Sequence, residues 1–203
     1  MHHTLDELLT IVYHYYPRGD DPEFRTRPEY VHLSAARKQA GSGPEYEHWR
    51  DMLARLRARF PDCKVANWSF HLPTGDCDGG YRRDLTTEYG AVVGLYVSFL
   101  VPYYVIYERL SGDHELEATV SIPLAEQPYA DGIAAETAVS YPGYEPLPYE
   151  VGSVVVPDVA REIGGLGATI YDLLFSPYDR LAMNEEDRRN HAAFMKAYRT
   201  MER

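Results

Sequence analysis

The sequence is poor in the residues and spacings that mark common chemistry. Among its 203 residues it has two cysteines, Cys63 and Cys77, which are too few for a disulfide framework. Its eight histidines form no H-x-x-x-H pair around a glutamate, and there is no paired C-x-x-C. Nor does it contain a phosphate-binding loop, a dinucleotide fingerprint or a G-x-S-x-G elbow. We therefore predict no bound metal and no cofactor, and we favour a binding protein over an enzyme.

Positive charge is also scarce. Lysine and arginine total 20 against 31 aspartates and glutamates, which gives a formal net charge of −11. Such a chain would repel nucleic-acid phosphates and attract a basic protein. Solubility alone also accounts for an acidic surface. We predict that the protein does not bind nucleic acid and that any protein partner is basic.

The sequence has one long apolar run, Gly90–Leu110, which approaches the roughly 20 residues of a membrane helix. However, β-branched and aromatic residues dominate the run, and these suit a strand better than a helix. Pro102 lies in its middle, where it would interrupt a helix and suits a strand start or a bulge. We predict two buried strands, Ala91–Val101 and Tyr103–Arg109, or one strand bent at Pro102, and no membrane span.

The start of the sequence, MHHTLDELL, lacks the basic segment and apolar stretch of a signal peptide. Together with the absence of a predicted membrane span, this pattern indicates a cytoplasmic protein with reduced thiols. The sequence leaves the oligomeric state open.

Hydrophobic periodicity predicts the remaining elements. The expected helices share an apolar stripe, a capping residue or an initial proline: Thr4–Tyr16, Pro28–Ala40, Pro44–Phe60, Pro128–Ser140, Asn184–Met201 and a short one within Asp158–Gly167. The expected strands alternate or are short and apolar: Lys64–Leu72, Leu116–Ile122 (in a hairpin with Tyr103–Arg109) and Val151–Val156. The less regular segments are a polar loop over Asp76–Glu88, an extended connector over Pro142–Pro148, and Thr169–Phe175, which fits either a strand or a helix.

This order of elements predicts an α+β fold, with a mixed, mainly antiparallel central sheet and amphipathic helices packed on it. We expect a single domain over residues 1–203, which is long enough to bury a core. Its parts would be a helical N-terminal part (1–60), a sheet-forming part (61–175) and a C-terminal helix (176–203).

The loop HLPTGDCDGG, residues 71–80, holds the densest group of reactive side chains. A hydrolase or transferase would use His71 to deprotonate Cys77, with Asp76 or Asp78 orienting the imidazole. The two neighbouring carboxylates oppose this chemistry, because they raise the pKa of the thiol. We therefore assign no catalytic residue and retain His71, Cys77 and Asp76 only as an alternative.

Three segments resemble known sequences: YHYYPRG (Tyr13–Gly19), SFLVPYYVIYE (Ser98–Glu108) and EVGSVVVPDV (Glu150–Val159). They are similar to stretches of uncharacterised bacterial proteins associated with the immunity proteins of polymorphic toxin systems. The resemblance implies a small acidic cytosolic inhibitor that captures a cognate toxin. It brings no catalytic or binding residues with it.

Our hypothesis from the sequence is a non-catalytic acidic binding protein, of the immunity type, whose partner is a basic toxin. Tyrosine is favoured at recognition surfaces, and the chain has 18 of them. A structural subunit of a larger assembly is a further alternative. The predicted partner-binding residues lie in the polar loop and the proline connector: Asp76, Asp78, Tyr81, Tyr141, Tyr144 and Tyr149.

Overall fold

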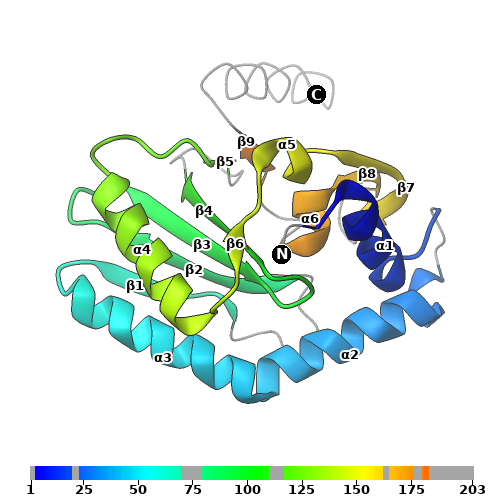
Figure 1. Ribbon diagram of the computed structural model, residues 1–203, viewed down its shortest axis with the longest axis horizontal. Coiled ribbons are helices and arrows are strands. Elements are labelled where there is room, and N and C mark those ends of the chain that lie inside the picture. The colour runs from blue at the N-terminus through cyan, green and yellow to red at the C-terminus, as the bar shows by residue number, and fades with distance from the viewer. Residues whose placement is uncertain are drawn as a thin grey trace, which may run out of the picture.

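The computed structural model of the chain describes residues 3–19, 23–69, 79–109, 117–161, 165–175 and 180–182. It confirms the α+β class, with a mixed, mainly antiparallel sheet and helices packed on both of its faces (Figure 1). Among the described helices, none is long and apolar enough to cross a membrane. The predicted C-terminal helix lies outside the described residues.

The N-terminal part contains the three predicted helices: α1 (Leu5–Tyr15), α2 (Pro28–Ser42) and α3 (Pro44–Arg59), with a short 3-10 turn, η1 (Phe24–Thr26), before α2. Thr4 and Glu7 form the predicted capping box at the start of α1. Proline occupies the first position of both α2 and α3, where its missing N–H leaves no unsatisfied donor. The local signals were therefore sufficient for this part of the fold.

The main sheet has the strand order β1-β2-β3-β4-β5-β9, and β6 pairs with β4 as well. The strands span Lys64–Asn67 (β1), Gly80–Thr86 (β2), Val92–Ser98 (β3), Tyr103–Arg109 (β4), Glu117–Thr119 (β5), Glu145–Pro146 (β6) and Arg180–Ala182 (β9). The two strands predicted in the long apolar run are confirmed as β3 and β4, and Pro102 directly precedes β4. The predicted hairpin is confirmed as the antiparallel pair β4–β5, although β5 ends at Thr119 and not at Ile122.

The predicted loop Asp76–Glu88 is wrong in its second half, because Gly80–Thr86 is a central strand. β2 pairs antiparallel with β1 on one side and with β3 on the other, and every residue from Gly80 to Leu85 is buried. The sequence GYRRDLT looks solvated because it holds three consecutive charges. The preceding strand also ends earlier than Lys64–Leu72 predicts, since β1 stops at Asn67 and Trp68 is 44% exposed.

The segment after the proline connector also differs from the prediction. Val151–Val156 was expected as a strand, but Tyr149–Gly152 is a short helix, α5, and β7 runs over Val155–Arg161. The described residues of Asp158–Gly167 form no helix, because those up to Arg161 belong to β7, which pairs with β8 (Gly165–Thr169). Pro157 does not end the strand, since it lies where a register shift interrupts the ladder.

Two further segments are helical: one that the sequence left open between strand and helix, and one whose start it gave approximately. Thr169–Phe175 contains α6 (Ile170–Leu174), which begins at a capping box formed by Thr169 and Asp172. The helix predicted from Pro128 begins one residue earlier and is α4 (Gln127–Ser140). The connector Pro142–Pro148 contributes β6.

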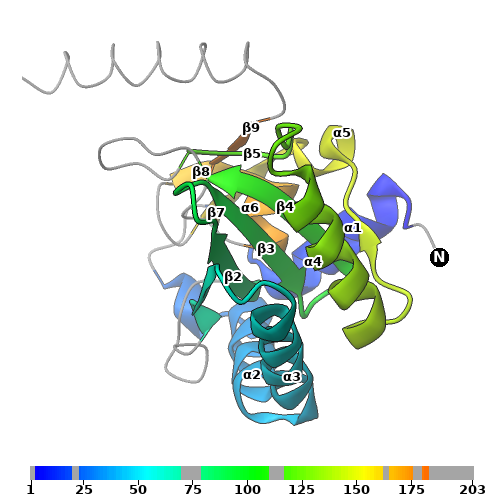
Figure 2. The ribbon, with the colours of Figure 1, turned by 90° about the vertical axis from the view of Figure 1, so that its left-hand side faces the viewer.

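The sheet separates two hydrophobic cores. On one face, α3 and α4 cover the strands, with Trp49, Leu56 and Ile133 packed against Val93 and Leu95. On the other face, α1, α6 and the β7–β8 pair cover Tyr96, Tyr107 and their neighbours (Figures 1 and 2). Burial on both faces explains why β3 and most of β4 are almost continuously apolar.

Gly94 on β3 provides a test of this packing. A Cβ atom at Gly94 would lie 2.0 Å from Cζ of Tyr107, whose ring stacks on Tyr96 at 5.1 Å between centroids. We predict that Gly94→Ala lowers the free energy of unfolding by about 1–3 kcal/mol, measured by urea denaturation, because the ring must move. In a Tyr107→Ala background the same substitution should lower the free energy of unfolding much less. Equal costs in the two backgrounds would contradict the proposed contact.

Candidate functional site

The residues predicted for catalysis fall outside what the structure describes. His71, Asp76 and Cys77 lie in the undescribed segment between β1 and β2, and so does Asp78. Their suggested roles in catalysis or partner binding stay predictions. Within the described residues, no group of three or more histidine, cysteine, aspartate or glutamate side chains could hold a metal ion.

Two of the four tyrosines predicted to bind a partner are buried. Tyr81 is 1% exposed, stacks on Trp49 with 5.3 Å between ring centroids, and donates a hydrogen bond to the carbonyl of Ala40 (3.0 Å). Tyr141 is 6% exposed and packs in the same core. Burial raises the pKa of both phenols. Because these two side chains belong to the core, they are not available as surface contacts in this structure.

The other two predicted tyrosines, Tyr144 and Tyr149, are half-buried. Tyr144 packs on Tyr141 at 5.2 Å between ring centroids, and Tyr149 lies near the ring of Tyr171. The sequence could not separate these from the buried pair, because all four occur in polar or proline-rich surroundings.

On the opposite face of β2, Asp84 is the centre of a buried polar cluster. Its carboxylate accepts hydrogen bonds from Nε1 of Trp68 (2.7 Å) and from the hydroxyl of Tyr107 (2.9 Å). It also forms an ion pair with Arg109 at 2.7 Å, with the Asp84 and Arg109 side chains 5% and 16% exposed. We call these four residues the Asp84 cluster. Its donors come from the end of β1 and from β4, so it ties three strands together.

Arg83, the neighbour of Asp84, is buried without such partners. Its side chain alternates to the other face of the sheet, the face that bears Tyr81 and Leu85. It is 0% exposed, and none of its guanidinium nitrogens has a hydrogen-bond partner within the described part of the chain. Removal from water lowers the pKa of Arg83 to about 10, although Tyr107 and Asp84 favour the charged form. Such a group is a cost to stability.

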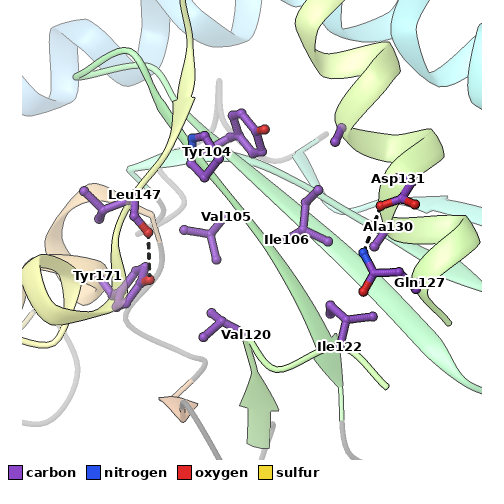
Figure 3. A pocket seen from close by; sticks show the side chains of 12 residues that line it. Tyr104, Val105, Ile106, Val120, Ile122, Gln127, Ala130, Asp131, Leu147 and Tyr171 are labelled. Carbon is purple, nitrogen blue, oxygen red and sulfur yellow. Dashed lines mark hydrogen bonds between the residues drawn. The ribbon is translucent and has the colours of Figure 1, made fainter. Parts of the chain in front are cut away.

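The described structure also has a pocket of about 330 Å³ at the outer edge of β4 (Figure 3). One wall is Val105 and Ile106 of β4, and α4 forms the facing wall with Ala130 and Ala134. The remaining walls are apolar at Val120, Ile122 and Leu147. We call this the β4-edge pocket.

The polar side chains that line the β4-edge pocket are those of Tyr104, Tyr171, Gln127 and Asp131. The hydroxyl of Tyr171 donates a hydrogen bond to the carbonyl of Leu147 (3.3 Å), so it cannot donate its proton to a ligand at the same time. On α4, Nε2 of Gln127 donates to Oδ1 of Asp131 (2.8 Å), and both side chains lie at the same side of the pocket (Figure 3). The carboxylate of Asp131 is therefore the charged group of the pocket.

The chain around this pocket carries charge of one sign. Residues 110–160 contain no lysine or arginine, and their acidic residues are Asp113, Glu115, Glu117, Glu126, Asp131, Glu136, Glu145, Glu150 and Asp158. Glu136 is neutralised by Arg55 (2.9 Å) and Arg59 (3.4 Å) of α3. Among the described residues, Glu126, Asp131 and Glu150 have no ion pair. This acidic segment is readable in the sequence, whereas the pocket it surrounds is not.

The chain has been compared with protein families, characterised proteins and solved structures. No family model, curated protein or solved structure matches it. The fold and site therefore define only a class: an α+β protein with a largely buried charged cluster in its sheet and a pocket at the edge of β4.

The contribution of Asp84 to stability can be tested by removing its acceptor oxygens. We predict that Asp84→Ala lowers the free energy of unfolding by about 3–5 kcal/mol, because it removes the largely buried carboxylate that pairs with Arg109 and accepts hydrogen bonds from Trp68 and Tyr107. Asp84→Asn should cost less, since an acceptor remains for Trp68. The control is Glu47→Ala, whose exposed ion pair with Arg50 (3.1 Å) should contribute under about 1 kcal/mol. Urea denaturation of the three variants measures this, and equal losses for Asp84→Ala and Glu47→Ala would refute it.

Replacing Arg83 should change the free energy of unfolding in the opposite direction to replacing Asp84. We predict that Arg83→Met raises the free energy of unfolding by about 1–4 kcal/mol, because it replaces a buried charge that has no hydrogen-bond partner among the described residues with an apolar side chain of similar length. The matched control is Arg82→Met. The guanidinium of Arg82 lies over the ring of Tyr96 at 5.5 Å, so its loss should lower stability. A loss of stability in Arg83→Met would show that this arginine holds a partner in solution.

Proposed function

We propose that the protein is a non-catalytic binding protein that captures a basic protein partner through the surface around the β4-edge pocket. The observation that carries the proposal is the segregation of charge. Over residues 110–160 the chain has acidic side chains and no lysine or arginine, and this segment supplies β5, α4, β6 and α5. A field of one sign over one surface speeds encounter with a partner of the other sign.

The groups that would meet the partner are the exposed or half-buried acidic side chains for which the described residues provide no ion pair. Asp131 lines the pocket and is exposed, as is Glu150 on α5. Glu126 lies directly before α4. Two apolar side chains of the same segment also face solvent: Leu124, two residues before Glu126, is 90% exposed, and Val139, near the end of α4, is 69% exposed. Exposed acidic and apolar side chains in one segment suit a protein interface better than a surface that serves solubility alone.

We further propose that this partner is the toxin of a bacterial effector system, with the present chain as its immunity protein. The support is the resemblance of three sequence segments, together with the acidic character that a basic toxin domain would require. The partner would then be encoded beside this chain, and binding would neutralise it.

The experiment measures binding and neutralisation of the protein encoded by the adjacent gene. The triple variant Glu126→Lys, Asp131→Lys, Glu150→Lys should slow association by about tenfold or more at 0.1 M salt, where screening extends over about 10 Å. The control variant, Asp51→Lys, Asp62→Lys, Glu88→Lys, makes the same change in net charge at exposed sites elsewhere. Association and protection from toxicity should be nearly normal in the control. Equal slowing in both variants would contradict a localised acidic face, and absence of any binding would contradict the immunity role.

A further inference from the structure

The β4-edge pocket exists because two strands share one edge of β4 without meeting. β6 pairs in parallel with the start of β4, at Tyr103 and Tyr104. β5 pairs antiparallel with its end, at Glu108 and Arg109. Between these positions, no strand of the described structure pairs with this edge at residues 105–107. The pocket occupies this gap and extends to both faces of the sheet, because Val105 and Ile106 point to opposite sides.

The walls of the pocket favour an apolar occupant. Most of the lining side chains are apolar, and the polar ones are Tyr104, Tyr171, whose hydroxyl is bonded to Leu147, and Gln127 and Asp131 on α4. A volume of about 330 Å³ is at the small end of the roughly 300–1,000 Å³ of small-molecule sites, so a bulky cofactor would not be enclosed. One side chain of a partner fits this size and chemistry.

Charge identifies the neighbours of that side chain. Asp131 keeps a carboxylate oxygen that is not bonded to Gln127, and this oxygen can accept from an ammonium or guanidinium group. Glu126 precedes the same turn of α4, and residues 110–160 offer no positive charge that would repel a cation. The side chain that enters the pocket should therefore be flanked by lysine or arginine.

We infer that the β4-edge pocket receives one aromatic side chain from a basic polypeptide, with the flanking cations of that polypeptide held by Asp131 and Glu126. This inference rests on the proposed function, and it specifies which feature of the partner is recognised. An aromatic anchor in a desolvated pocket with a charged rim is the usual arrangement of a binding hot spot.

The test uses capped pentapeptides with two lysines on each side of a central phenylalanine or glycine. At 0.05 M salt the phenylalanine peptide should bind about tenfold or more tightly than the glycine peptide, measured by isothermal titration calorimetry. Ala134→Trp, which fills the pocket from the half-buried face of α4, should abolish this difference and leave weak binding of both peptides. The control is Ala135→Trp, at an exposed position that does not line the pocket, which should keep the difference.

The outcomes separate the two proposals. If both peptides bind equally to the unaltered protein, and binding falls in the Glu126→Lys, Asp131→Lys, Glu150→Lys variant, the acidic face stands and the anchor inference is overturned. If neither peptide binds, both are overturned. If neutral N-acetylphenylalanine amide binds as tightly as the phenylalanine peptide, the pocket takes small apolar molecules and the inferred cationic flank is wrong. Ile122→Ala, which enlarges the pocket without a bulky insertion, gives a second variant should Ala134→Trp fail to fold, and it should weaken only the phenylalanine peptide.

Discussion

The burial of β2 is the constraint on which the rest of the structure depends. This strand holds three consecutive charged residues, Arg82, Arg83 and Asp84, in the interior of a sheet that is covered on both faces. Buried charge is expensive unless it is paired and hydrogen-bonded. For Asp84 the cost is offset by Trp68, Tyr107 and Arg109. The ring of Tyr107 reaches Asp84 only because Gly94 between them has no side chain, so the cluster also fixes β3.

The same arrangement determines where the β4-edge pocket forms. Fixing β4 through Tyr107 and Arg109 leaves its outer edge to β6 and β5, which cover only the two ends of that edge. The pocket lies in the gap, and α4 closes its far side. α4 is in turn held to α3 by the pairing of Glu136 with Arg55 and Arg59. These contacts pair Arg55 and Arg59 with Glu136, whereas Asp131 on α4 and Glu150 on α5 are exposed.

The sequence was sufficient where a local pattern matches local structure. Apolar stripes, caps and initial prolines predicted α1 to α3, and β-branched and aromatic content predicted β3 and β4. It failed at β2, because RRD reads as solvent-exposed unless the distant donors Trp68, Tyr107 and Arg109 are known. It failed at β7, because Pro157 looks like a strand end and a bulge accommodates it instead. The β4-edge pocket could not be predicted, since its walls come from residues as distant as Tyr104 and Tyr171.

Native-state hydrogen exchange tests most directly whether β2 is the buried centre of the sheet. We predict that the backbone amides of Arg82, Arg83 and Asp84 exchange only through global unfolding. Their free energy of opening should equal that of the amides of Leu95 and Tyr96 on β3. Amides in the adjacent turn, such as that of Tyr89, whose side chain is 83% exposed, should exchange orders of magnitude faster. If the β2 amides exchanged as fast as that of Tyr89, the segment would be a surface loop, and the Asp84 cluster and the placement of the pocket would both be wrong.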